Sequence, residues 1–386
     1  MSDLRDVKGI VDIEELRRFV DETKWIWPYE ELLVLYDPRN NIVLLGENYG
    51  PENCCFGDTT RFHNIKEASK DIVLDSYLSG TWTFYMVKPG IEAKLKLIPS
   101  FAPAGIESVM LQQDKQINKQ TDEQADKQID KQANRQADKH ASHTNNKAVV
   151  TYAGLGGYGV SASYSRGVAK GVEAVEIFEA GGGERLGRAG FTLHTYHLLT
   201  FGVDDTDNHD TGATYALVKR IGVDLQTSAR MQYGEPVVKL LFAPEVQLYP
   251  FAPDKTKNCF ASGVSFGVRD GVDGLDDFLV ANFVKQLKEY TSSPNTGLII
   301  YSGVWITEEM MAYSDRARRE IIDLEDACHN AFKTLEQQGF MFHEITGSKG
   351  LIGAAAVPGM LYWPDEAGKV LPEHRRRFIA KGDPRK

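Results

Sequence analysis

The sequence predicts an α/β or α+β fold with more than one domain, and three observations support that prediction. Short apolar runs typical of buried strands alternate along the chain with amphipathic segments typical of helices. The length of 386 residues is enough for two or three domains, each with its own core. The composition, with 42% hydrophobic and 25% charged residues, is ordinary for a soluble globular protein.

The overall charge and the lack of long apolar runs argue against two broad classes of protein. A formal net charge of -10 disfavours an overall electrostatic footprint for nucleic acid. The basic stretch HRRRFIAKGDPRK near the end is expected to be a frayed, solvated tail. No apolar run approaches the ~20 residues of a membrane span, and the charged N-terminus lacks a signal-peptide core. We therefore expect a cytoplasmic protein without a membrane partner.

Residues 1–190 are predicted to form an N-terminal α+β domain with a mixed sheet. Asp12 is placed to cap a helix whose apolar residues recur at helical spacing. The stretch ELLVLYDPRNNIVLLG predicts two strands joined by a turn at residues 37–41. The glycine run at 154–159 has the spacing of a dinucleotide-binding loop, but no clear βαβ unit or well-placed ribose acid accompanies it. A tight turn where backbones approach closely is the better interpretation.

A repeat of four-residue units interrupts this domain. From residue 114 the chain reads DKQINKQTDEQADKQIDKQANRQADKHA. This segment has too few apolar residues to offset its ordering entropy by burial. We predict a disordered, solvated insertion over residues 112–147, and a coiled-coil or partner-binding segment is the alternative.

The C-terminal half is predicted to alternate strands with helices. Helices are expected at 213–221, at 276–290 and at 316–338, the last of which ends near Gly339. Strands are predicted in HLLTFGV, PVVKLLFAPEVQLYP, ASGVSFGV and TGLIIYSG. Such alternation is typical of α/β or α+β packing.

An acidic cluster follows directly on one of these strands. Asp204, Asp205 and Asp207 repel one another at neutral pH, so holding them together is unfavourable unless water or a cation screens them. Mg²⁺ prefers oxygen ligands and is commonly held by one or two carboxylates plus substrate phosphates. Gly212 and the Thr214 hydroxyl open the next helix, whose N-terminal N–H groups suit phosphate. The pattern indicates a magnesium–phosphate site, and the alternative is an acidic turn whose aspartates cap the helix.

Four stretches, in the same order over about residues 195–360, resemble the archaeal 2-agmatinylcytidine synthetases of isoleucine tRNA. They read FGVDDTDNHDTGATYAL, LYPFAPDKTKNCFASGVSF, SSPNTGLIIY and GSKGLIGAAA. The resemblance implies a kinase-like α/β domain at 191–305 and a ferredoxin-like module with a basic C-terminal tail at 306–386. The sequence departs from the family where a C-T-T triplet has become Ala213-Thr214 and where K-T-R-G-N has become K-T-K-N-C.

Two further differences point to a particular relative of the synthetases. Their oligonucleotide-binding fold and zinc ribbon have no counterpart in this sequence, and the synthetases lack the region before residue 190. This arrangement is similar to the methanogenesis marker protein 11 family, methanogen-restricted archaeal relatives with no assigned reaction. The resemblance implies a related nucleotide site, with the tetrad insertion peculiar to this member.

The resemblance carries the site residues over one at a time. It implies that Asp204, Asp205 and Asp207 bind Mg²⁺ and the ATP phosphates and form the catalytic cluster. The other nucleotide-binding residues that it implies are Gly212, Thr214, Lys255, Thr256, Lys257, Gly350 and Gly353. Exposed loop lysines and a tight backbone turn are the structural alternatives for these lysines and glycines.

The favoured function is that of an ATP- and Mg²⁺-dependent enzyme, either a phosphotransferase or ligase-like. Its partners would be a nucleotide and an unknown acceptor, which is a small molecule, a protein or RNA. A tRNA-modifying enzyme is one alternative, and tRNA is less favoured because of the net acidity and the missing tRNA-binding modules. A non-catalytic nucleotide-binding assembly or regulatory factor for methanogenesis is the other, because the phosphate-facing loop differs from that of the synthetases.

Overall fold

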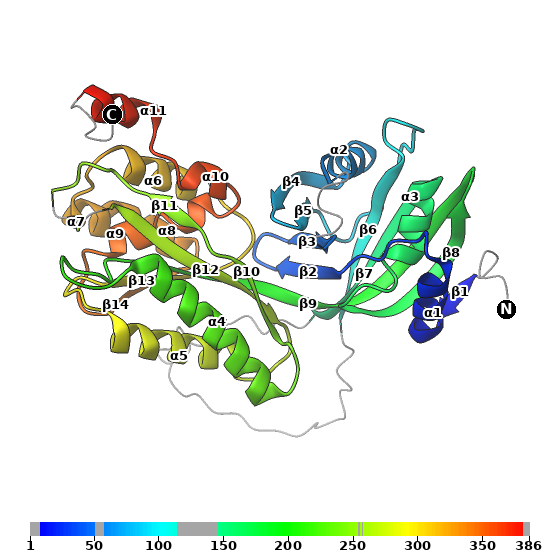
Figure 1. Ribbon diagram of the computed structural model, residues 1–386, viewed down its shortest axis with the longest axis horizontal. Coiled ribbons are helices and arrows are strands. Elements are labelled where there is room, and N and C mark those ends of the chain that lie inside the picture. Colours follow the sequence, from blue (N-terminus) through cyan, green and yellow to red (C-terminus); the bar gives the residue numbers. More distant parts are fainter. Residues whose placement is uncertain (1–7, 51–57, 114–144, 254, 257, 381–386) are drawn as a thin grey trace, which may run out of the picture. The chain divides into compact units, whose positions relative to one another are not determined.

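The computed structural model describes residues 8–50, 58–113, 145–253, 255–256 and 258–380 (Figure 1). The strands and helices in these residues confirm the predicted mixed α/β class. No helix among them is long and apolar enough to cross a membrane. The chain divides into two compact units, each described by itself. Unit 1 comprises Met1–Val34, Val43–Ser76 and Gly80–Tyr196, and unit 2 comprises Leu35–Ile42, Tyr77–Ser79 and His197–Lys386.

Most elements from β1 to the first part of β9 belong to unit 1. Their bounds are β1 Gly9–Val11, α1 Ile13–Thr23, β2 Glu31–Asp37, β3 Ile42–Asn48, α2 Asp58–Ala68, β4 Val73–Ser79, β5 Trp82–Val87, β6 Ala104–Gln113, β7 Asn145–Leu155, α3 Gly157–Val160, a π-helical turn Ser161–Ser165, β8 Val172–Gly182 and β9 Arg185–Asp204. The pairs β1–β8, β8–β9, β7–β9, β6–β7 and β3–β5 are antiparallel. A parallel bridge between Glu31 and Lys170 makes the pairing mixed.

A buried ion pair lies deep in unit 1. Arg166 Nε donates to Glu47 Oε1 at 2.8 Å, and the two side chains are 2% and 0% exposed. The guanidinium lies 4.4 Å from the ring centroid of Tyr29 and 4.2 Å from that of Tyr152. Burial alone would raise the pKa of Glu47, but the charge and hydrogen bonds of Arg166 lower it below its usual value. Removing only one partner would leave an uncompensated buried charge, so each side chain of the pair depends on the other.

The capping residue and the glycine-rich turn of unit 1 behave as predicted. Asp12 Oδ1 accepts a hydrogen bond from Glu15 N at 2.9 Å at the start of α1. In the glycine run, a Cβ on Gly154 would lie 2.6 Å from the carbonyl oxygen of Tyr158. This close backbone approach accounts for the glycine without a bound dinucleotide.

The insertion is shorter than the predicted range 112–147. β6 continues to Gln113 and β7 starts at Asn145, and these two residues pair in the antiparallel ladder. The prediction was wrong at its ends because a strand is held by backbone hydrogen bonds, which polar residues form as well as apolar ones. The remainder, residues 114–144, lies outside the described residues.

The other elements belong to unit 2. Their bounds are α4 Thr214–Tyr233, β10 Val238–Phe242, β11 Glu245–Gln247, β12 Phe260–Arg269, α5 Leu275–Tyr290, β13 Gly297–Ser302, α6 Glu308–Arg319, α7 Leu324–Asp326, a π-helical turn Ala327–Ala331, α8 Phe332–Gln337, β14 Phe340–Glu344, α9 Leu351–Ala354, a 3₁₀ turn Pro358–Met360, α10 Pro364–Ala367 and α11 Pro372–Ala380. The predicted domain boundary at residue 190 falls inside β9, and the boundary at residue 305 stays a prediction.

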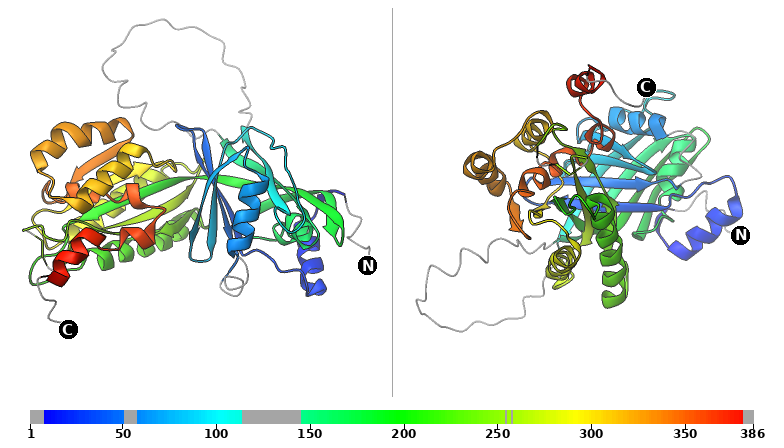
Figure 2. Two further views of the ribbon diagram at one scale, coloured as in Figure 1. Left: turned by 90° about the horizontal axis from the view of Figure 1, so that it is seen from above. Right: turned by 60° about the vertical axis from the view of Figure 1, so that its left-hand side comes forward.

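The sheet of unit 2 packs α4 and α5 on one face and α9 on the other. β9 pairs with β12 and β13, β13 pairs with β14, and β12 pairs with β10 and β11. Side chains alternate along β9, so Phe201 and Val203 enter the core formed with α4 and α5, where Phe201 stacks on Phe283 at 4.3 Å. Gly202 lies between them and faces Ala354 of α9. Figures 1 and 2 show α4 and α5 side by side.

The long helix predicted at 316–338 is wrong. Thr307 caps α6, which therefore begins earlier than predicted and already ends at Arg319. Asp323 then accepts a hydrogen bond from Asp326 N at 3.1 Å and starts a new helical segment. This local cap competes successfully with a continuous helix. The predicted end near Gly339 is confirmed, because α8 stops at Gln337.

The basic stretch near the end of the chain is partly helical instead of frayed. Pro372 occupies the first turn of α11, a position that proline favours. His374 of this helix is buried and makes an edge contact with Tyr249, with ring centroids 5.2 Å apart. This packing supplies the burial that the sequence pattern did not reveal. Residues 381–386 of the predicted basic tail lie outside the described residues.

A buried histidine joins three elements of unit 2. His197 of β9 lies between Asp270 Oδ1, 2.9 Å from Nδ1, and Asp276 Oδ1, 3.0 Å from Nε2. Burial alone would lower the pKa of His197, but the hydrogen bonds and charges of the two aspartates raise it to about 9. Because β12 ends just before Asp270 and α5 contains Asp276, the imidazolium fixes both against β9.

We expect His197 to make stability depend on pH. Its pKa is higher in the folded protein, so its contribution is complete below pH 6.5 and is lost as the pH rises through about 9. A shift of this size corresponds to about 3 kcal/mol. Urea unfolding between pH 6 and 10 should show this slope in the wild type and lose it in His197→Gln. His209→Gln, which alters an exposed histidine of unit 2, should retain it, and equal slopes in all three proteins would contradict the assignment.

Candidate functional site

The acidic cluster lies where β9 ends. Asp204 is the last residue of the strand, and Asp205 adopts a left-handed conformation with φ of 55°. Aspartate tolerates this conformation better than most residues, yet it still costs about 1 kcal/mol or more. The turn directs the chain away from the sheet toward α4, so Asp204 keeps the strand's alternation whereas Asp205 and Asp207 do not.

Threonine 206, between the aspartates, anchors this turn. Thr206 is 1% exposed and its carbonyl oxygen accepts a hydrogen bond from Ser292 N at 2.8 Å. Its hydroxyl lies 3.0 Å from that of Thr214, the first residue of α4. The carbonyl of Asp205 accepts from Thr296 Oγ1 at 2.7 Å. These bonds hold the acidic turn against the loop between α5 and β13 and against the start of α4.

The carboxylate of Asp207 links two other segments. Its Oδ1 accepts from Thr214 Oγ1 at 3.2 Å, and its Oδ2 accepts from Thr256 Oγ1 at 3.1 Å. Gly212 packs directly on Asp207, since a Cβ there would lie 2.7 Å from the Asp207 Cα. The structure therefore brings together the acidic turn, the helix start and the K-T loop, as the sequence implied.

The glycine turn at α9 packs against the acidic cluster from the other face of the sheet. A Cβ on Gly353 would overlap Asp204 Oδ2, and a Cβ on Gly350 would lie 2.6 Å from Gly297 N. Any side chain at Gly353 would therefore displace the Asp204 carboxylate. Gly350 packs on backbone, whereas Gly353 also faces a cavity.

Two adjoining cavities surround these residues. The larger, of about 500 Å³, is lined by residues 207–215 together with Glu245, Thr256, Asn258, Phe260 and Ser262. The smaller, of about 160 Å³, is lined by all three aspartates of the cluster and by Lys255, Thr256, Lys349 and Gly353, among others. Asp207 and Thr256 border both. The predicted residue Lys257 lies outside the described residues.

The electrostatics of the smaller cavity favour a bound cation. Burial, and then the charge of Asp205, raise the pKa of Asp204 well above its usual value, and Asp207 adds to this effect. Burial and the charge of Asp204 raise the pKa of Cys259 to about 12, so this thiol is protonated at neutral pH. Burial is the larger cause of both shifts, and the neighbouring carboxylates add negative charge that a cation would relieve.

The donor set fits Mg²⁺ in its usual mode of binding. Within the described ranges, no three His, Cys, Asp or Glu side chains are close enough to form a complete metal cage. Mg²⁺ commonly takes only one or two carboxylates and completes its shell with water and substrate phosphates. Asp204, Asp205 and Asp207 line one cavity and offer such oxygens. The fit is therefore to a metal–phosphate complex instead of an isolated ion.

Sequence reasoning missed several residues that shape the site. Thr206 and Thr296 fix the acidic turn through their hydrogen bonds, and Thr291 Oγ1 also donates to the Thr206 carbonyl at 3.2 Å. The threonine between the aspartates was a visible signal, because short hydroxyl side chains stabilise turns. Thr291 and Thr296 gave no such signal, since 85 and 91 residues separate them from their partners.

Comparison with known proteins gives one sequence relative and several distant structures. No family model matches the chain. An uncharacterized protein of Methanocaldococcus jannaschii is 29% identical over 333 residues, which cover 86% of this chain and 93% of the relative. TiaS in complex with its isoleucine tRNA and ATP has a TM-score of 0.32 at 20% identity, and a tRNA fluorescent labeling enzyme 0.30 at 22%. Apo TiaS, a tRNA agmatidine synthetase, has 0.29 at 20%. Each covers 42% of this chain, which spans only 36%, 36% and 35% of the respective solved chains.

These findings bear on two expectations. A likeness to the agmatidine synthetase is present over 42% of the chain, whereas the archaeal relative has no methanogenesis marker name. The expectation that tRNA is a disfavoured partner finds no support in them.

We expect Gly353→Ala to destabilise the protein by about 1–3 kcal/mol, because its Cβ would overlap the Asp204 carboxylate. Chemical denaturation measures this loss. Gly157→Ala is the matched control, since nothing lies within 4 Å of a Cβ at that position. Equal stability of the two variants would show that the turn and Asp204 are not packed as described.

Proposed function

We propose that unit 2 binds ATP with Mg²⁺ and uses it in a phosphotransferase or ligase-like reaction. The observation that carries this proposal is one cavity lined jointly by Asp204, Asp205, Asp207 and Lys255. Carboxylates and a lysine around one hollow supply both signs of charge that a magnesium–phosphate complex requires. The start of α4 borders the adjoining cavity, and its cap residue Ala213 has no polar side chain to occupy the first-turn N–H groups. These N–H groups suit phosphate oxygens.

Each residue has a role that follows from its position. Asp205 and Asp207 would hold the ion, Asp204 would assist them, and Lys255 would neutralise charge on the transferred phosphate. The hydroxyl of Thr256 orients Asp207. Bound Mg²⁺ would supply positive charge at the phosphate oxygens. Such catalysis depends mainly on positioning and electrostatics, which the anchored turn provides.

Replacing Asp205 tests the proposal directly. We expect Asp205→Asn to reduce ATP consumption at least about 100-fold, because one charged ligand of the metal–phosphate complex is lost. Thermal unfolding should show that the variant still folds. Asp273→Asn, which neutralises an exposed turn carboxylate elsewhere in unit 2, should leave ATP consumption unchanged. Full turnover by Asp205→Asn would contradict the proposal.

Magnesium dependence tests the nucleotide site, and product release separates an enzyme from a non-catalytic nucleotide-binding protein. We expect ATP to raise the melting temperature only when Mg²⁺ is present, because the phosphates and carboxylates otherwise repel. Release of ADP, AMP or pyrophosphate under the same conditions marks an enzyme. Stabilisation without any product would favour a nucleotide-binding assembly or regulatory factor.

We also propose that the chain is a member of the methanogenesis marker protein 11 family, which is restricted to methanogens. This part of the proposal rests on the motif resemblance.

A tRNA-modifying enzyme is the second candidate, favoured by the exposed arginines 375–377 of α11. If they contact RNA phosphates, tRNA affinity should fall steeply with salt, and replacing all three by glutamine should flatten that dependence. Filter binding at several salt concentrations measures both effects. Arg220→Gln on the exposed face of α4 is the control. Binding that does not depend on salt would argue against this candidate.

A further inference from the structure

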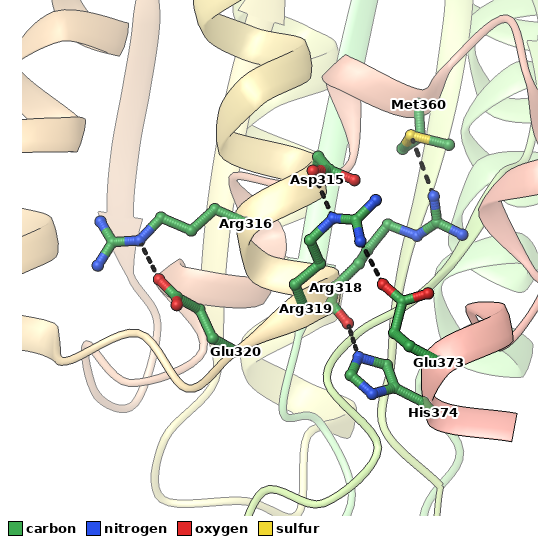
Figure 3. A network of polar contacts seen from close by, with 8 residues as sticks. All are labelled: Asp315, Arg316, Arg318, Arg319, Glu320, Met360, Glu373 and His374. Atoms are coloured by element: carbon green, nitrogen blue, oxygen red, sulfur yellow. Dashed lines mark hydrogen bonds and ion pairs between the residues drawn. The ribbon is translucent and has the colours of Figure 1, made fainter. Parts of the chain in front are cut away.

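Helix α6 carries three arginines, and only one of them lacks a carboxylate partner among the described residues. Arg316 Nε lies 2.7 Å from Glu320 Oε1, and Arg319 pairs with Glu373 (Figure 3). Arg318 is 6% exposed and forms no ion pair within the part of the chain that the structure describes. The helix therefore buries the one of its three guanidinium groups that makes no direct ion pair within the described ranges.

The described contacts of Arg318 are with neutral groups. Its Nη2 donates to the carbonyl oxygens of Glu366 at 2.6 Å and of Lys369 at 3.1 Å. Its Nη1 lies 3.9 Å from Met360 Sδ, as Figure 3 shows, and its buried Nε makes no hydrogen bond to any residue that the structure describes. Burial lowers the pKa of the guanidinium below its usual value. The charges of Asp315, Glu366 and Glu373 oppose this effect without a direct ion pair to Arg318. An anion in direct contact would therefore stabilise the buried guanidinium further.

Arg318 lines a cavity of about 810 Å³, a volume typical of small-molecule sites. Lys255, Lys369 and Arg375 line the same cavity, against a single carboxylate among its described lining residues, that of Glu366. Lys369 Nζ lies 2.8 Å from Glu366 Oε1, so that pair is already neutral. Arg375 forms no ion pair with any described residue and is exposed. In a chain of net charge -10, this cavity is locally positive.

The basic cavity adjoins the proposed nucleotide site. Lys255, Asn258 and Cys259 line both this cavity and the smaller one at the acidic cluster. The lining also includes apolar residues, among them Leu371 and Phe378. A ligand in this cavity would thus place an anionic group near Arg318 and Arg375 and an apolar part against α11, within reach of the shared wall.

We propose that this cavity binds the acceptor substrate, a small molecule that carries a phosphate group and an apolar portion. The assignment of this ligand as acceptor rests on the proposed nucleotide site. Arginines recognise phosphate through several donors at once. The cavity is lined by two arginines and two lysines. An RNA backbone fits less well, because Arg318 is almost fully buried and RNA contacts require an exposed basic surface.

Inorganic phosphate is the probe for a test on the full chain. Thermal unfolding is followed against phosphate concentration, with Mg²⁺ and a non-hydrolysable ATP analogue saturating the nucleotide site. We expect a saturable rise in melting temperature for the wild type. Arg375→Gln, which removes an exposed guanidinium from the cavity wall, should weaken the apparent phosphate affinity about tenfold or more. Arg318→Gln should do the same, while Arg319→Gln on the same helix should respond as the wild type does.

The outcomes separate this proposal from the nucleotide site. If the ATP analogue raises the melting temperature and phosphate does not, the assignment of the basic cavity as a phosphate site is wrong, and the proposed nucleotide site is retained. Phosphate could instead raise the melting temperature in a way that Arg375→Gln weakens, while the ATP analogue leaves the melting temperature unchanged. That result would support the phosphate cavity and overturn the nucleotide site. Equal phosphate affinities in Arg375→Gln and the wild type would overturn the cavity assignment. A short RNA that displaces phosphate with much higher affinity, and that no longer binds Arg375→Gln, would overturn the small-molecule assignment.

Discussion

The candidate site depends on one close approach between backbones. The turn before α9 lies directly on the ends of β9 and β13, where Gly350 meets Gly297 and Gly353 meets the Asp204 carboxylate. Side chains larger than hydrogen at these positions would push the turn before α9 away from the ends of β9 and β13. The acidic cluster would then lose the surface on which it packs. The larger core beneath α4 and α5 holds the sheet, but this contact decides where Asp204 points.

Threonine hydroxyl groups make a second set of contacts that holds the candidate site in place. The acidic turn is fixed by threonines from three segments: Thr214 at the start of α4, Thr256 in the K-T loop and Thr296 before β13. Like charges are thus brought together by neutral donors, which offset the repulsion without cancelling the charge. The result is a negative, pre-formed turn, which is the electrostatic arrangement that metal-dependent phosphate chemistry uses.

Local patterns in the sequence predicted the elements well but not their interruptions. The Asp12 cap, the turn at residues 37–41 and the strand that carries the acidic cluster follow from spacing within a few residues. The helix predicted at 316–338 failed because Asp323 forms a competing cap, which periodicity does not register. The order of strands depends on contacts between distant segments, on which a single sequence carries little information.

The candidate site shows the same difference between features visible in short stretches and features that depend on contacts between distant segments. Asp204, Asp205, Asp207 and Thr214 were predicted because charge clusters and helix starts are visible in short stretches, whereas Thr256 followed only from the family resemblance. The structure places all five around two adjoining cavities, and their role as ligands stays a prediction. Arg318 could not be singled out, since three arginines of one helix look alike in sequence. Only the packing of residues 366–369 over α6 distinguishes the arginine that donates to backbone carbonyls from its two neighbours paired with carboxylates.

The segment that contains Lys255, Asn258 and Cys259 forms a wall common to two cavities of opposite charge. A ligand in either cavity would contact residues that also line the other cavity, so each ligand would affect the affinity of the protein for the other. Thermodynamics requires such an effect to be mutual: whatever factor one occupant adds to the affinity of the second, the second adds to the first. The shared wall therefore makes the affinities for the two ligands interdependent as a consequence of the fold.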